Sequence, residues 1–254
     1  MDHREEVANR PLARENTVIK PPPTVGEPAV TRTVILVHGL WMTGLELLWL
    51  AWGLRCAGFR VRTFHYPSVR LDLAENGRRL ARYQEKILAR GDEPTGKTHL
   101  VAHSLGGLVC AQMLRDQPAQ AAYTERFVAL GVPFLGSASA KKLATFPLGT
   151  RIIGHAFPRT KGATNFPEIL PCERWTHPIE LGSIAGNYPL GVGRLVRAFT
   201  TPNDGVVAVA ETRLPGATAY LTLPINHVAM TFSRRVMAET CHFLRHGAFE
   251  EGGR

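Results

Sequence analysis

The sequence predicts an α/β fold in which a mostly parallel central sheet is covered by helices on both faces. Segments with strand patterns alternate with segments of helical periodicity about six times along the chain, which is typical of such sheets. Two of the strand segments, residues 33–37 and 98–103, are short and rich in apolar or β-branched residues, as expected of strands buried on both faces. At 254 residues the chain is also long enough for one large core.

Each element follows from its local pattern. We expect strands where apolar and β-branched residues cluster or alternate, and helices where apolar residues recur every three or four positions. Glycines end the first two helices, because glycine commonly terminates a helix. In chain order, the expected elements are a strand at 33–37, a helix at 44–58, a strand at 59–67, a helix at 73–91, a strand at 98–103, a helix at 105–117, strands at 125–133, 179–186 and 217–224, and a closing helix at 231–247.

Residues 31–250 are expected to form a single domain. Residues 1–30 are polar and contain "KPPPTVGEP", a composition typical of a flexible N-terminal arm. Residues 134–178 interrupt the alternation of strands and helices and are rich in glycine, proline and aromatic residues. We interpret this segment as a short cap-like insertion at the carboxyl ends of the strands, where it would cover a site.

The charge of the chain is basic, with 30 lysines and arginines against 21 aspartates and glutamates and a formal net charge of +9. The basic residues are scattered and form no stripe with interleaved aromatic residues, which argues against nucleic acid as a partner. Contact with an anionic membrane surface stays open as an alternative.

The four cysteines are widely separated and form no C-x-x-C pair, so neither a zinc motif nor a thiol redox motif is predicted. Lone cysteines suit a reducing compartment. The first twenty residues lack the apolar core of a signal peptide, and no segment reaches the ~18 uninterrupted apolar residues of a membrane span. We therefore expect a cytoplasmic protein with neither metal nor cofactor.

"GDEPTGKT", residues 91–98, matches the phosphate-binding pattern G-x-x-x-x-G-K-[ST]. That loop works when a strand precedes it and a helix follows, so that backbone N–H groups point at the phosphates. Here a helix precedes the match and a strand follows, and Pro94 removes one N–H group. We interpret the match as a helix-to-strand turn, and a nucleotide-binding protein with Lys97 on phosphate stays as the alternative from a different class.

"VAHSLGG", residues 101–107, places Ser104 directly between a strand and a helix. In the nucleophile elbow G-x-S-x-G, the positions two before and two after the serine are small because strand and helix approach closely. Gly106 meets this requirement, and Ala102 departs from it by one methyl group. A structural serine in a small-residue turn is the alternative, but the strand and helix on either side predict that Ser104 is a nucleophile.

"VHGLW" follows the first strand, where the backbone N–H group of Leu40, together with that of Leu105 after the nucleophile, is placed to bind an oxyanion. His38 is interpreted as a structural residue of this turn.

His227 is the expected base among the ten histidines, because it follows the last strand and precedes the closing helix, downstream of the serine. His103 is expected to point away from the serine hydroxyl, since side chains alternate along a strand.

Asp116 and Asp204 are the aspartates that follow the nucleophile in the chain. Asp116 falls near the end of the next helix, on the wrong side of the sheet. Asp204 lies in "TTPNDGVVAV", where a carboxylate can accept from one nitrogen of His227 and leave the other facing the serine. An Asn-Asp-Gly turn with a solvated carboxylate is the alternative. Weaker candidates for the acid are Glu173, Glu180 and Glu211.

The chain resembles esterases and lipases of the α/β-hydrolase fold, of the small bacterial lipase-like and inositol-deacylase-like kind. The resemblance spans about residues 31–246 and rests on "LVHGL", "VAHSLGGLV", "LGVPFLGS", "NDGVV" and "NHVAMTF". It implies Ser104 as nucleophile, Asp204 as acid, His227 as base, and Leu40 and Leu105 as oxyanion donors. The chain departs from the family at Ala102 and in lacking the secretory signal expected of an extracellular lipase, which puts bulk triglyceride in doubt as its substrate.

We therefore expect a serine hydrolase that cleaves carboxylic esters through a Ser-His-Asp triad and an acyl-enzyme. Trp41, Phe134 and Phe146, with Leu40, are expected to line an apolar acyl pocket, although core packing explains these residues equally well. The partner would be a small-molecule or lipid ester. An acyltransferase, a thioesterase or an amidase on the same triad stays open, as does a member of the fold that binds a ligand without turnover.

Overall fold

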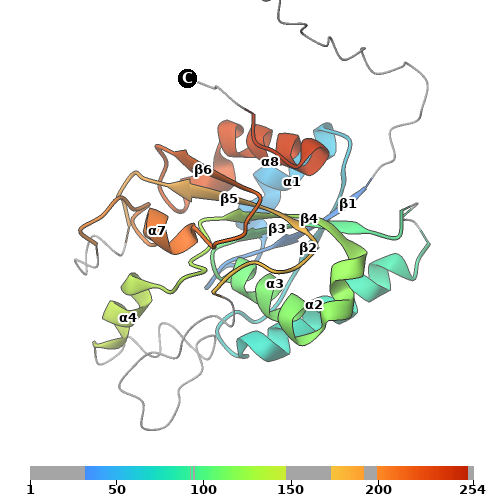
Figure 1. Ribbon diagram of the computed structural model, residues 1–254, viewed down its shortest axis with the longest axis horizontal. Helices are drawn as coiled ribbons and strands as arrows, with labels where there is room; N and C mark the ends of the chain where they lie inside the picture. Colours follow the sequence, from blue (N-terminus) through green and yellow to red (C-terminus); the bar gives the residue numbers. More distant parts are fainter. Residues whose placement is uncertain (1–31, 92, 94, 147–172, 192–198, 251–254) are drawn as a thin grey trace, which may run out of the picture. The chain divides into compact units, whose positions relative to one another are not determined.

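The computed structural model describes residues 32–91, 93, 95–146, 173–191 and 199–250. The predicted arm, residues 1–30, and residues 147–172 of the predicted insertion lie outside these ranges. Within them the elements confirm the predicted α/β class, with strands and helices alternating along the chain (Figure 1).

Within the described residues, six strands form one sheet in the order β2-β1-β3-β4-β5-β6. All neighbouring strands run parallel, so their carboxyl ends meet at one edge of the sheet, where ligands bind in folds of this kind. The strands are β1 (Thr33–Val37), β2 (Arg60–Phe64), β3 (Thr98–His103), β4 (Thr124–Leu130), β5 (Glu180–Gly186) and β6 (Ala219–Leu223).

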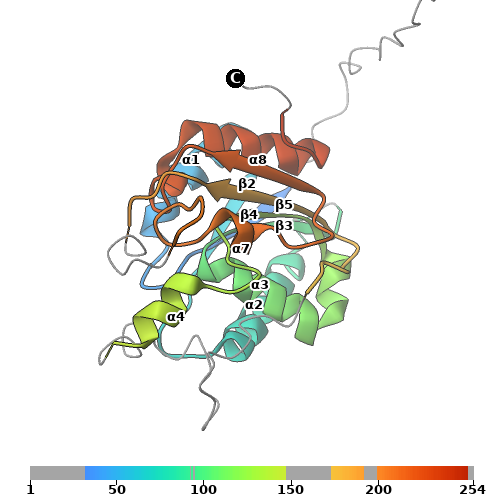
Figure 2. The ribbon, with the colours of Figure 1, turned by 60° about the vertical axis from the view of Figure 1, so that its left-hand side comes forward.

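Helices cover both faces of this sheet, as the sequence predicts. α1 (Leu48–Cys56) and α8 (Arg234–His246) lie on one face, and α2 (Leu73–Leu88) and α3 (Leu105–Asp116) pack against each other on the opposite face (Figure 1 and Figure 2). None of the helices in the described ranges has the length and apolar character needed to cross a lipid bilayer.

The side chains of β1 show why its sequence lacks alternation. Val34 and Leu36 pack in the apolar cluster beneath α1 and α8, whereas Ile35 and Val37 pack in the cluster beneath α2 and α3. Because both faces of a central parallel strand are covered, every position favours an apolar residue.

Five short helical elements are not predicted as separate elements; the first lies inside the helix expected at 44–58, and the last overlaps the start of the helix expected at 231–247. Their three to seven residues span one or two turns, which leaves too few positions for an apolar period to repeat. They are η1 (Leu45–Leu47), η2 (Pro118–Tyr123), α4 (Ala138–Ala144), α7 (Val209–Thr212) and η4 (Ala229–Phe232). α4 lies in the described part of the predicted insertion, and the Ser137 hydroxyl caps it by accepting from the N–H of Ala140 at 3.2 Å.

His99 is a buried histidine in β3 whose ring contacts Phe59 edge-on, with centroids 6.0 Å apart. Neither of its ring nitrogens has a hydrogen-bond partner in the described part of the chain. Burial, and then the nearby charges of Arg32 and Arg126, lower the pKa of His99 from 6.5 to about 3. The folded protein therefore holds this imidazole neutral at pH values where the unfolded chain protonates it.

This difference predicts an acid-dependent loss of stability. Between pH 6.5 and about 3 the unfolded chain binds one more proton at His99 than the folded chain, so the free energy of unfolding falls as the pH drops, by about 1 kcal/mol per pH unit. In His99→Leu, we expect the slope of the unfolding free energy between pH 6 and pH 4 to be smaller by this amount. Urea titrations at several pH values measure the slope.

Leu100→Ala is the control, because it removes buried apolar contacts from the same strand without removing a titratable group. It lowers the free energy of unfolding at every pH and leaves the slope as it is in the wild type. A His99→Leu variant with the wild-type slope would show that His99 does not carry the pH dependence.

Candidate active site

Ser104 sits in a strained turn at the carboxyl end of β3. Its backbone φ of 52° and ψ of −126° place it in a region that L-residues rarely occupy, at a cost of about 1–3 kcal/mol. Its N–H donates to the carbonyl of Leu130 at 2.9 Å, which ties the turn to β4. α3 begins at the next residue, so the turn has the strand-to-helix geometry of a nucleophile elbow.

Gly106 explains why this turn needs a small residue after the serine. A methyl group added to Gly106 would lie 2.5 Å from the carbonyl oxygens of Val37 and His38. The first turn of α3 therefore packs directly on the backbone at the end of β1. On the strand side, Ala102 is buried, and its methyl group is accommodated in the apolar cluster beneath α2 and α3.

His227 and Asp204 form a hydrogen-bonded pair between Nδ1 and Oδ2 at 2.7 Å. Both side chains are buried, with Asp204 only 1% exposed. The backbone N–H of His227 also donates to the carbonyl of Asp204 at 2.9 Å, which fixes the two loops to each other. Since the carboxylate accepts at Nδ1, that nitrogen carries the proton and Nε2 is left as the base.

The other carboxylate oxygen of Asp204 accepts from the N–H groups of Val206 at 2.9 Å and Val207 at 2.7 Å. Asn203 completes the turn by accepting from the N–H of Gly205 at 3.0 Å. The Asn-Asp-Gly turn exists as the sequence suggests, but its aspartate is buried and fully hydrogen-bonded. The alternative of a solvated carboxylate is therefore wrong.

Gly131, directly after β4, makes room for this pair. It has a φ of +57°, and a methyl group there would lie 3.0 Å from Nδ1 of His227 and 3.2 Å from Oδ2 of Asp204. Because β4 is the neighbour of β3, the pair lies beside Ser104 at the carboxyl edge of the sheet. The Ser104 hydroxyl has no hydrogen bond to another described residue, and catalytic hydrogen bonds often form only when substrate is bound.

The turn after β1 approaches the serine from the other side. A methyl group on Gly39 would lie 3.2 Å from Cβ of Ser104. No described residue accepts a hydrogen bond from the backbone N–H of Leu40 or of Leu105, so both donors are available to a ligand. Trp41 follows with a φ of 60°, and its N–H donates to the Ser68 hydroxyl at 3.1 Å.

His103, the residue before Ser104, supports His227. Its Nε2 donates to the carbonyl of His227 at 3.0 Å, and the two rings lie 4.6 Å apart. Burial, and then the proximity of His227, lower the pKa of His103 to about 3, so it stays neutral. Local sequence patterns do not predict this supporting contact, because the two residues lie 124 positions apart.

The residues expected to line an acyl pocket differ in how far their side chains are exposed to solvent. Trp41 is 62% exposed and Phe146 is half-exposed at the end of α4, whereas Phe134 is fully buried and packs edge-on against Phe127. Leu40 packs partly buried against the core beneath α2 and α3. Further exposed apolar side chains occur on η1 and α1 and on η4 with the residue before it, and these three elements contact one another: Leu45, Leu48, Trp52, Val228 and Phe232.

His38 occupies the structural position that the sequence suggests. Its Nδ1 donates to the carbonyl of Gly39 at 2.9 Å, its Nε2 accepts from the N–H of Tyr66 at 3.4 Å, and its ring stacks on that of Tyr66. Burial lowers the pKa of His38. The residue therefore shapes the turn before Leu40.

The other acid candidates are occupied elsewhere. Asp116 ends α3 and pairs with Arg115 at 2.9 Å, and Glu180 begins β5 and pairs with Arg126. Glu173 is exposed. Glu211 accepts from the N–H groups of Ala138 and Ala208, and burial raises the pKa of this carboxyl. Asp204 is the carboxylate that contacts His227.

The phosphate-loop match lies between α2 and β3, so a helix precedes it and a strand follows. Lys97 is exposed, and Glu93 is buried with its carboxylate accepting from Thr33. This is the inverted order that the sequence predicts. Across the described ranges, no group of three or more His, Cys, Asp or Glu side chains is arranged to hold a metal ion.

Comparison with known proteins agrees with this fold. Residues 34–239 match the model of a family described as "Alpha/beta hydrolase family". The mature form of a lipase from Bacillus licheniformis superposes with a TM-score of 0.66, with 22% identity over 89% of this chain and 96% of the lipase. A metagenomic carboxyl esterase gives a TM-score of 0.55, with 19% identity over 87% of this chain and 71% of the esterase.

Lipase B from Aspergillus fumigatus gives a TM-score of 0.60, with 15% identity over 85% of this chain and 53% of the lipase. At these identities the similarity concerns the fold. A search among curated proteins found no significant match to this chain.

The contact at Gly106 predicts a large loss of stability in Gly106→Ala. The added methyl group would overlap two backbone oxygens, and overpacking of this kind costs about 1–3 kcal/mol. Gly58→Ala is the control, because nothing lies within 4 Å of its added methyl group and only its φ of +91° is unfavourable. Urea unfolding should show a greater loss in Gly106→Ala, and an equal loss would contradict the close contact between α3 and β1.

Proposed function

Because the chain belongs to the alpha/beta hydrolase family, we propose that it hydrolyses carboxylic esters, with Ser104 as nucleophile, His227 as base and Asp204 as acid. The observation that carries the proposal is the buried 2.7 Å hydrogen bond between His227 and Asp204, located at the same sheet edge as the strained Ser104 turn.

The tautomer of His227 determines its role. With Nδ1–H held by Asp204, the lone pair of Nε2 is available to take the proton of the Ser104 hydroxyl as it attacks the ester carbonyl. The carboxylate then stabilises the imidazolium that results. His103, through its contact with the His227 carbonyl, limits movement of the base.

The backbone N–H groups of Leu40 and Leu105 would stabilise the negative charge on the carbonyl oxygen during this attack. Support comes from their free hydrogen-bonding capacity and from the close approach of Gly39 to Ser104. His227 returns its proton to the leaving alcohol, which departs and leaves an acyl group on Ser104. Water, deprotonated by His227, then attacks the acyl group, and the carboxylic acid and free serine are released.

The surface near His227 favours esters with hydrophobic acyl chains. Val228, the next residue, is exposed together with Phe232, and the contacts of η4 with η1 and α1 extend this apolar surface to Leu45 and Leu48. Trp41, which follows the oxyanion turn, adds a large exposed ring. Phe134 is less suited to contact substrate, because its ring is already covered by core packing.

The same serine, histidine and aspartate could also catalyse reactions with other acyl donors or other acyl acceptors. Transfer to an alcohol in place of water, and cleavage of thioesters or amides, would proceed through the same acyl-enzyme. A membrane surface is a further source of ester substrate, consistent with the exposed apolar side chains on η1, α1 and η4.

The test of the proposal is turnover of p-nitrophenyl esters with acyl chains of increasing length. We expect the wild type to cleave them and to be labelled by a fluorophosphonate, whereas Ser104→Ala does neither. Ser233→Ala is the control, since it removes a serine whose hydroxyl caps α8, and we expect it to retain activity. Turnover in Ser104→Ala equal to the wild type would rule out the mechanism, and a wild type that resists labelling would indicate a non-catalytic member of the family.

Replacement of the acid predicts a specific kinetic defect. Asp204→Asn keeps the shape of the side chain but lets His227 adopt the wrong tautomer, so kcat should fall by up to about 10⁴-fold. The matched control is Asp116→Asn, which makes the same change at the end of α3 and leaves kcat unaltered. Steady-state kinetics on one ester compares the two, and equal kcat values would exclude Asp204 as the acid.

A further inference from the structure

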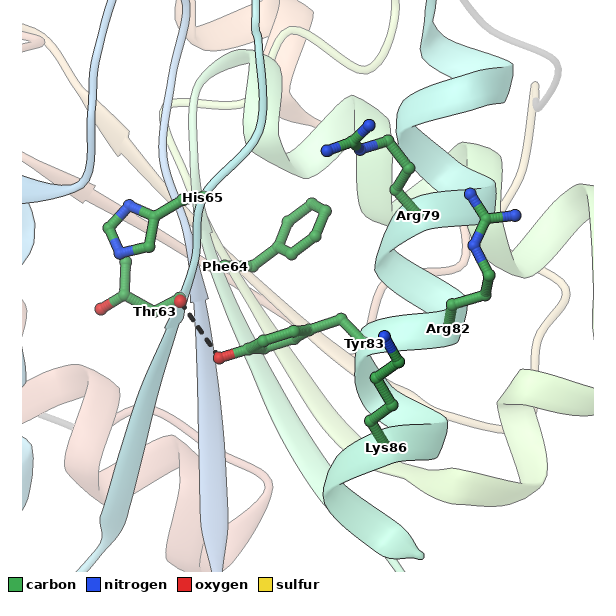
Figure 3. A pocket seen from close by; sticks show the side chains of 7 residues that line it. All are labelled: Thr63, Phe64, His65, Arg79, Arg82, Tyr83 and Lys86. Carbon is green, nitrogen blue, oxygen red and sulfur yellow. Dashed lines mark hydrogen bonds between the residues drawn. The ribbon is translucent and has the colours of Figure 1, made fainter.

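A pocket of about 380 Å³ lies between the edge strand β2 and helix α2, apart from the serine site. Figure 3 shows its lining, with Phe64 and Tyr83 between the strand and the helix and three cationic side chains extending from α2. Its seven lining residues are Thr63, Phe64, His65, Arg79, Arg82, Tyr83 and Lys86. No carboxylate is among them.

The cations come from one stripe of α2. Arg79, Arg82 and Lys86 are spaced three and four residues apart, so their side chains share one side of the helix. Within the described part of the chain, neither Arg79 nor Lys86 forms an ion pair, and Arg82 has one contact with Glu75 at 3.4 Å. The pocket therefore concentrates positive charge that the described residues leave largely uncompensated.

The surroundings of Tyr83 extend this positive field. Burial raises the pKa of the Tyr83 phenol, and the nearby charges of Arg62 on β2 and Arg90 after α2 oppose this shift. Glu85, the other acid of this stretch, accepts instead from Gln120 at 2.7 Å. Among the acidic side chains of α2, Glu75 therefore compensates Arg82 in part, whereas Glu85 is bound elsewhere.

The floor of the pocket is formed by two aromatic rings, and the backbone carbonyl beside them already accepts a hydrogen bond. The rings of Phe64 and Tyr83 lie 5.3 Å apart, and the Tyr83 hydroxyl donates to the carbonyl of Thr63 at 3.1 Å. This bond occupies a backbone oxygen at the sheet edge that would otherwise repel an anion. What remains for a ligand are donors and cations above an apolar base.

The pocket is separate from the serine. Phe64 is level with Val37 of β1, which is level with Ala102 of β3. At about 4.8 Å between neighbouring strands, β2 lies roughly 10 Å to the side of β3. The pocket residues therefore lie to the side of the acyl chemistry at Ser104.

We propose that this pocket binds a phosphate group, either on a small soluble molecule or on the headgroup of a phospholipid. The two guanidinium groups and the ammonium group are positively charged and donate hydrogen bonds, which phosphate oxygens accept. The aromatic floor favours a phosphate attached to an organic group over the free ion. Binding here is independent of the proposed ester hydrolysis.

The test compares pyrophosphate and lipid vesicles as probes. The pocket variant is Arg79→Gln with Lys86→Gln, and its control is Arg115→Gln with Arg234→Gln, which removes the same charge from exposed positions on α3 and α8. We expect titration calorimetry to show pyrophosphate binding by the wild type and the control, and a Kd raised by about tenfold or more in the pocket variant. Added salt should weaken the binding, since exposed charges are screened.

Vesicles identify the source of the phosphate. Co-sedimentation with phosphatidylcholine vesicles containing phosphatidic acid, but not with phosphatidylcholine alone, should be reduced in the pocket variant if the headgroup is the ligand. Pyrophosphate binding without this vesicle effect assigns a soluble ligand. A wild type that binds neither probe, or a pocket variant that binds both as well as the control does, overturns the proposal.

The ester assay separates this proposal from the proposed function. The pocket variant should cleave p-nitrophenyl acetate as the wild type does, because its changes lie outside the serine site. Conversely, Ser104→Ala should bind pyrophosphate normally. Loss of ester cleavage in the pocket variant, or loss of pyrophosphate binding in Ser104→Ala, would contradict the independence of the two sites.

Discussion

The contact between the first turn of α3 and the end of β1 is the constraint on which the site depends. It exists because Gly106 presents no side chain to the carbonyl oxygens of Val37 and His38. This contact holds α3 close to the sheet, so the chain must reverse sharply at Ser104 and adopt a positive φ there. The serine is thereby lifted out of the strand and presented at the carboxyl edge.

The loops that follow β4, β5 and β6 are organised around one buried carboxylate. A buried charge is stable only when it is hydrogen-bonded or paired, and Asp204 meets this condition through Val206, Val207 and His227. The requirement fixes the histidine loop as well as the aspartate loop. His103 adds a third attachment from beneath, through the His227 carbonyl.

Two surfaces of opposite character flank the sheet edge. Exposed apolar side chains gather on η1, α1 and η4 beside His227, whereas α2 carries a stripe of cations against β2. The core-facing positions of α2 are buried, whereas its pocket cations Arg79, Arg82 and Lys86 are exposed.

The sequence by itself determined the α/β class, β1, β3 and the larger helices, because buried parallel strands and amphipathic helices leave local patterns. It also singled out Ser104, His227 and Asp204, through motifs whose order along the chain is meaningful. Only the tertiary structure decided that Asp204 is buried against His227, that His103 supports the base and that Phe134 belongs to the core. It also decided that the cations of α2 face a pocket, since contacts between distant segments leave no trace in local sequence.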